Sequence, residues 1–74
     1  MPKEKEKSLV CFGANIRRIR ETKGVSQEGL AFDCGLDRTY IGGAERGERN
    51  VTILSALKIA TALDCKLSDL VDGI

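Results

Sequence analysis

The 74-residue sequence contains no histidine and no tryptophan, one proline, two phenylalanines and one tyrosine. Without histidine, the chain lacks the side chain most often used as a general base or a metal ligand near neutral pH. It also shows no pair of acids suited to a cleft, no glycine-rich phosphate loop and no nucleophile beside a base. We therefore expect no enzymatic activity, no bound cofactor and no metal site.

Cysteine is present in an odd number, at Cys11, Cys34 and Cys65. No CxxC spacing occurs, so neither a disulfide framework nor a zinc site is indicated. The simpler interpretation is three small, reduced, buried side chains.

Long apolar runs are missing as well. No stretch reaches the roughly 18 apolar residues of a membrane span, and the first nine residues lack the apolar core of a signal peptide. These absences predict a cytoplasmic protein that does not enter a membrane. The length predicts one domain, which buries roughly 60% of its unfolded surface, so association could add to a thin margin of stability.

A strong net charge is also absent, because the formal net charge is only +1. Its distribution is uneven, however. The following basic residues fall in the first two thirds of the chain: Arg17, Arg18, Arg20, Lys23, Arg38, Arg46 and Arg49. The segment after residue 50 is mildly acidic, so one end of the molecule can be basic. Such charges favour a nucleic-acid partner, although solvated charges without a partner are the alternative.

Residues 1–7 alternate in charge and predict a disordered arm, with a folded domain over residues 8–74. The arm could touch DNA or have no role, and the second interpretation is preferred. The first helix is expected to begin at Ser8 as N-cap and to end at Gly24. Its apolar residues recur at spacings of three and four: Leu9, Phe12, Ile16 and Ile19.

Three shorter helices are predicted after it, in residues 26–34, 37–46 and 53–63, and a fifth helix of a turn or two is expected to follow Ser68. Ser26, Asp37 and Thr52 are suitable N-cap residues, and glycine follows the first two of these segments. No segment alternates with period two, so the sequence predicts an all-α fold. The apolar face of the fourth helix is expected to contain Ile53, Ala56, Leu57, Ala60 and Leu63.

The second and third helices are joined by only Gly35 and Leu36, which predicts two helices crossing at a large angle. The small Ala31 permits close approach, and Ile41 holds the third helix to the core. That arrangement lets one helix lie across a DNA backbone while the next enters the major groove. The outward face of the third helix is expected to contain Arg38, Thr39, Gly42, Gly43 and Arg46.

The stretch GVSQEGLAFDCGLDRTYIGGAERGERN resembles the lambda-repressor-like (Cro/cI, xenobiotic-response-element) helix-turn-helix family. The segment LDRTYIGGAERGERN is especially similar to the controller proteins of restriction–modification systems. The resemblance covers residues 9 to about 72. It implies a compact five-helix lambda-repressor-like domain and a sequence-specific regulator that binds double-stranded DNA.

The resemblance also implies roles for individual residues. Gln27 would bond a backbone phosphate, Arg38 would present its guanidinium to a guanine, and Thr39 would reach a base or a thymine methyl. Tyr40 would contact a phosphate or stack on the groove wall, or else brace the helix from a half-buried position. Arg46 and Arg49 lie past the third helix and would contact phosphate or, as in some controller proteins, the groove.

Two further features of the resemblance concern structure. Arg20 and Glu45 would form a buried or half-buried ion pair that ties the first helix to the third. Gly42 and Gly43 adjoin in the recognition helix, and each costs about 1 kcal/mol relative to alanine. Gly43 would allow close backbone approach to DNA, or these small residues are simply tolerated.

A single recognition helix covers too few base pairs to define a site, so we expect a homodimer with half-sites about 34 Å apart. The candidate dimer-interface residues are Leu54, Leu67, Leu70, Val71 and Ile74. The alternative is that this C-terminal segment only closes the core of the monomer. The alternative function is an antitoxin-type protein-interaction module that also regulates its own operon. No small-molecule effector is expected.

Overall fold

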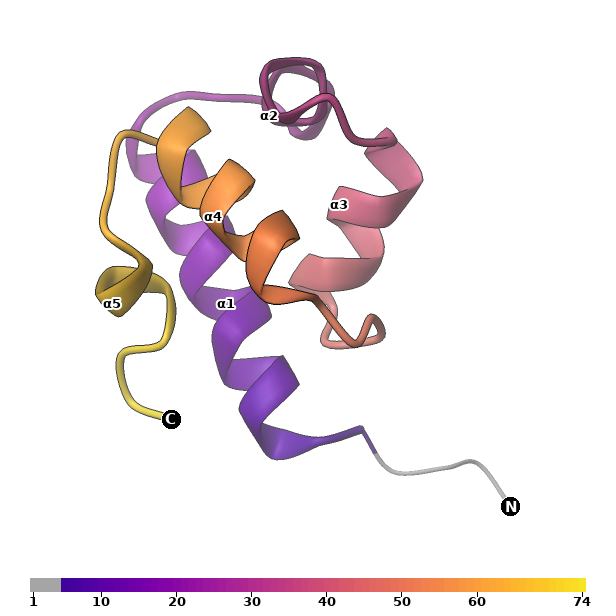
Figure 1. Cartoon of the computed structure of the whole chain (residues 1–74), viewed down its shortest axis with the longest axis vertical. Helices are drawn as coiled ribbons and strands as arrows, with labels where there is room; N and C mark the ends of the chain where they lie inside the picture. The colour runs from indigo at the N-terminus through magenta and orange to yellow at the C-terminus, as the bar shows by residue number, and fades with distance from the viewer. Residues whose placement is uncertain (1–4) are drawn as a thin grey trace.

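The computed structural model describes residues 5–74, which form five helices and no strand. The helices are α1 (Lys7–Thr22), α2 (Gln27–Cys34), α3 (Arg38–Glu45), α4 (Ile53–Ala62) and α5 (Leu67–Leu70). The long α1 runs the length of the molecule, with α5 to its left, α3 to its right and α4 in front of it (Figure 1). The all-α prediction is confirmed.

The first helix begins at Lys7, one residue before the expected N-cap Ser8. Glu6 occupies the N-cap position without a side-chain hydrogen bond, so this end has no capping signal for the sequence to reveal. Residues 1–4 of the predicted arm lie outside the described residues. The apolar spacing was correctly interpreted, since Phe12 and Ile16 are buried.

The next three helices begin at the predicted N-caps. The Ser26 hydroxyl accepts a hydrogen bond from the Gly29 amide at 2.9 Å, and the Asp37 carboxylate accepts one from the Thr39 amide at 2.7 Å. The Thr52 hydroxyl caps α4 in the same way. Each cap satisfies a backbone donor that has no partner within its own helix.

One core joins all five helices. Its largest fully buried side chains are Ile16, Leu30, Ile41, Ile59, Leu63 and Leu70. The predicted inner face of α4 was partly wrong, because Ile53 and Leu57 are 73% and 43% exposed. The helix instead turns Ala56, Ile59 and Ala60 inward, and its two small alanines allow the helix to pack closely.

The C-terminal segment is fastened to α1 by polar contacts. The buried Asn15 amide donates to the Leu70 and Asp72 carbonyls, both at 2.9 Å. This anchoring places Leu70 wholly inside the core. Its assignment to a dimer interface is therefore corrected, because the side chain has no surface to offer a partner. Val71 and Ile74 remain exposed.

The three cysteines are free thiols. Cys34 is buried as expected, whereas Cys11 and Cys65 are only half-buried. Burial raises the pKa of the Cys34 and Cys65 thiols, and a protonated thiol is a poor nucleophile. Among the described residues, no helix combines the length and apolarity needed to cross a membrane.

Candidate nucleic-acid interface

A turn of three residues, Gly35 to Asp37, joins α2 to α3, and the glycine makes this turn possible. Gly35 adopts the left-handed conformation with φ of 69°, which a side chain would disfavour. The Leu36 amide then donates to the Ala31 carbonyl at 2.9 Å and closes the end of α2. Figure 1 shows α2 nearly end-on and α3 from its side, so the two axes cross at a large angle.

This crossing turns one side of α3 inward and leaves its beginning exposed. Ile41 and Ala44 are buried against the core, whereas Arg38 and Thr39 are exposed. The Arg38 guanidinium lies 3.8 Å from the Glu28 carboxylate, and both side chains are largely in solvent. Since exposed pairs of this kind are weak, Arg38 is available to another acceptor.

Two arginines beyond α3 fold back over its paired glycines. A Cβ atom on Gly42 would lie 3.1 Å from Nη1 of Arg46, and one on Gly43 would lie 3.0 Å from Cγ of Arg49. Both glycines are buried. The expectation that they are open to the outside is therefore wrong, because the side chains of Arg46 and Arg49 cover them.

Tyr40 is half-buried and packs against the core. The guanidinium carbon of Arg49 lies 5.4 Å from the centre of its ring, which is the range of a cation–π contact. The ring therefore braces α3 and also holds Arg49 beside the exposed start of the helix.

The predicted Arg20–Glu45 ion pair is present. Nε and Nη2 of Arg20 donate to the two carboxylate oxygens of Glu45 at 2.6 and 3.1 Å, and the Glu45 side chain is only 3% exposed. The hydrogen bond to Glu45 raises the pKa of the Arg20 guanidinium. The Gln27 amide also donates to Glu45, at 3.0 Å, so one carboxylate joins α1, α2 and the end of α3.

Sequence reasoning missed two residues beside this surface. The Glu48 carboxylate accepts from Nε of Arg46 at 2.9 Å and lies 3.3 Å from Nζ of Lys5. These two cations lower the pKa of Glu48. Lys5 and Glu48 are far apart in the chain, and nothing in the spacing of the charges indicated that they meet.

Sequence reasoning also missed the close contact between α1 and the end of α3. A Cβ atom on Gly13 would overlap the Ala44 carbonyl oxygen and would lie 2.5 Å from that of Glu45. Glycine at this position therefore lets α1 touch the backbone at the end of α3. The signal available in the sequence was a glycine inside an otherwise regular helix.

The remaining predicted interface residues differ in exposure. Leu54 is 72% exposed, and Leu67 is half-buried against the core. An apolar groove crosses the ends of α1, α4 and α5, and it is lined by Ser8, Leu9, Phe12, Val51, Thr52, Ile53, Ala56, Leu67, Val71 and Ile74. In residues 5–74, no cluster of three histidine, cysteine or acidic residues could hold a metal ion.

Comparison with known proteins agrees with this geometry. A helix-turn-helix family model matches residues 16–70. The control protein C.BamHI of Bacillus amyloliquefaciens is 50% identical over 64 residues, which span 85% of this chain and 79% of that protein.

Two crystal structures of controller proteins are similar to the whole fold. The restriction–modification controller C.AhdI of Aeromonas hydrophila has 54% identity and a TM-score of 0.86, with 88% of this chain and 98% of that one covered. C.Esp1396I, solved as a tetramer with its natural 35 base-pair operator, has 43% identity and a TM-score of 0.78, with 82% and 80% covered.

Proposed function

The chain belongs to the helix-turn-helix family, and we propose that it acts as a sequence-specific DNA-binding transcriptional regulator. The observation that carries the proposal is the exposed beginning of α3. The helix is held at a large angle to α2 by the Gly35 turn and is flanked by Arg46 and Arg49. This arrangement fits a helix whose first residues contact base edges in the major groove.

We assign base contacts to Arg38 and Thr39, the exposed residues at the start of α3. Arginine can donate two hydrogen bonds to guanine, and threonine can contact a base or a thymine methyl. Gln27, Arg46 and Arg49 would contact phosphates, and the Tyr40 ring would support Arg49. Gly43 would not contact DNA directly, because the Arg49 side chain covers it.

The regulator is proposed to bind as a homodimer on a pseudopalindromic operator. The apolar groove, whose lining includes the exposed Val71 and Ile74, supplies a surface that a second copy could cover. Leu67 also lines the groove, and Leu54, next to the lining residue Ile53, would lie at its margin. Dimerisation doubles the number of bases read and makes binding depend on the spacing of half-sites.

The relatives narrow the biological role. Since the proteins described above are restriction–modification controllers, we propose the same role for this chain, with its own operon among its targets. Such a regulator would work beside the bacterial chromosome, in the cytoplasm. Its proposed activity is DNA binding without catalysis.

Binding to a random-sequence duplex, measured by fluorescence anisotropy between about 50 and 200 mM salt, tests the DNA-binding part of the proposal. Affinity should fall steeply with salt, because phosphate contacts release counterions. Operator sequences selected from a random library should then show two half-sites. A binding curve that does not respond to salt would contradict the proposal.

Arg38→Ala tests the assignment of base contacts. It should weaken binding to the selected operator by about tenfold or more, and it should relax the preference for one base, because a bidentate contact is worth about 1–3 kcal/mol. Arg17→Ala, on the exposed face of α1, is the control. Equal losses on operator and random DNA would show that Arg38 contacts phosphate instead.

A further inference from the structure

A single carboxylate stands between two cations at the edge of the proposed DNA-binding surface. One oxygen of Glu48 accepts from Nε of Arg46 at 2.9 Å, and the other lies 3.3 Å from Nζ of Lys5. The carboxylate therefore presents an oxygen to each cation, as a phosphate group can. All three side chains are about half exposed, so DNA can reach them.

Stability does not explain an acidic residue at this place. The Glu48 amide donates to the Gly43 carbonyl at 2.9 Å, so the residue follows directly on the C-terminal end of α3. The partial negative charge of a helix C-terminus disfavours a carboxylate there. Ion pairs with this much exposure also contribute little to folding.

The position of Arg46 makes the arrangement relevant to DNA. Nη1 of its guanidinium and Oε1 of Gln27 would lie 3.1 and 3.7 Å from a Cβ atom on Gly42, and its Nε donates to Glu48. A phosphate that approaches Arg46 must come close to Glu48, and two negative charges a few ångströms apart repel each other.

We propose that Glu48 is an internal competitor for DNA phosphate: its carboxylate holds Arg46 and Lys5 in the free protein and gives both up when DNA binds. The inference rests on the proposed DNA-binding function and extends the DNA-binding surface to Lys5, two residues before α1 begins. Glu48 thereby limits the affinity of the surface for any duplex. Non-specific binding depends almost wholly on phosphate contacts. Glu48 should therefore weaken binding to non-specific DNA more than binding to the operator.

The decisive variant is Glu48→Gln, which keeps the shape of the side chain and removes its charge. It should bind a random-sequence 20 base-pair duplex about fivefold more tightly per subunit at low salt, on the scale of one unit-charge repulsion in water. Lys5→Gln should weaken binding and reduce the slope of log K against log salt by about one per subunit.

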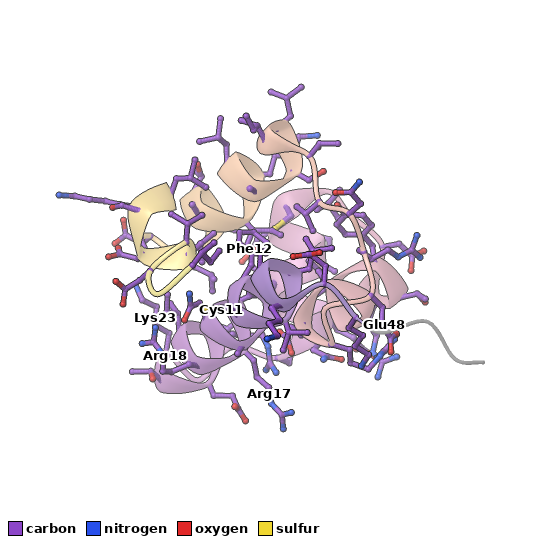
Figure 2. The ribbon with its side chains drawn as sticks, turned by 90° about the horizontal axis from the view of Figure 1, so that it is seen from below. Cys11, Phe12, Arg17, Arg18, Lys23 and Glu48 are labelled. Carbon is purple, nitrogen blue, oxygen red and sulfur yellow. The ribbon has the colours of Figure 1, made fainter. Side chains whose placement is uncertain are left out.

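Glu21→Gln is the matched control, because it makes the same change in net charge. Glu21 pairs with Arg17 at 3.3 Å on α1, and Figure 2 shows Arg17 and Glu48 on separate parts of the surface. Circular dichroism should confirm that the three variants keep the helical content of the parent chain.

The outcomes separate the inference from the function on which it rests. A gain for Glu48→Gln that exceeds the gain for Glu21→Gln supports the competitor role. Equal gains would show that the effect comes from net charge alone and would overturn the proposal. A Lys5→Gln variant that binds DNA as the parent chain does would show that Lys5 does not contact DNA. If the parent chain shows no salt-dependent binding, the proposed function fails first and this inference fails with it.

Discussion

Arg20 and Glu45 lie 25 residues apart in the sequence, yet their side chains form the most enclosed ion pair among the described residues. Each charge is acceptable inside the fold because the other is present. Glu45 keeps a hydrogen bond from Gln27, but a neutral amide cannot replace the charge of a guanidinium. The pair therefore fixes the end of α3. Removing either partner should lower the free energy of unfolding strongly, because the other charge is left unpaired.

Arg20→Met tests this dependence. It leaves the Glu45 carboxylate buried without its cation, and the free energy of unfolding should fall by about 3 kcal/mol. The double variant Arg20→Met/Glu45→Met should recover much of the loss, because it removes both charges. Urea unfolding at pH 7 measures the difference. A double variant no more stable than the single one would show that the lost contacts matter more than the unpaired charge.

The helices themselves differ in how clearly the sequence predicts them. Ser26, Asp37 and Thr52 marked the starts of α2, α3 and α4, because a cap is a local interaction between a side chain and the next turn. The N-cap of α1 was predicted two residues too late, at Ser8 instead of Glu6, because Glu6 provides no such bond. Local chemistry therefore predicts the limits of a helix only where a cap exists.

The faces of the helices were harder to predict than their limits. A stripe of apolar residues indicates an approximate direction, but α4 carries apolar residues on more than one side. The predicted inner face consequently contained Ile53 and Leu57 and omitted Ile59, although Ile59 is the one of the three that is buried. The contact between Lys5 and Glu48 had no local signal at all, since it depends on how α1 and α3 meet.

The paired glycines of α3 give this helix a property of its own. Gly42→Ala should raise the free energy of unfolding by about 1 kcal/mol, because alanine favours the helix more than glycine does. The new Cβ atom would lie 3.1 Å from Nη1 of Arg46, which is the free end of a flexible chain and can move away. Thermal unfolding followed by circular dichroism measures the gain.

The same change separates two roles of Gly42. If the absence of a side chain at Gly42 positions Arg46 for DNA, Gly42→Ala should weaken binding to a duplex even though the fold is more stable. Gly29→Ala in α2 changes another helical glycine away from both arginines and serves as the comparison. A stabilised variant with unaltered DNA binding would show that the glycines are only tolerated.

At the scale of the whole molecule, the apolar groove across the ends of α1, α4 and α5 leaves apolar side chains in contact with solvent. A chain of this size has a small core, so shielding further apolar surface by association is favourable. Val71 lines the groove and is 43% exposed. Its place is fixed by the hydrogen bonds of Asn15 to the carbonyls on either side of it. The groove is therefore a firm surface on which a second copy can pack.

Val71→Asp should abolish dimerisation, because a carboxylate would have to be buried in an apolar interface without a partner. Light scattering from low to high micromolar concentration should find a dimer for the parent chain and a monomer for the variant. Phe32→Asp introduces the same charge at an apolar side chain that is 87% exposed on α2, and it should leave the dimer intact. Loss of the dimer in both variants would point to net charge, and a dimer in both would place the interface elsewhere.

If the groove is the interface, Val71→Asp should also lose most of its affinity for an operator with two half-sites. Its affinity for a single half-site should remain close to that of the parent chain.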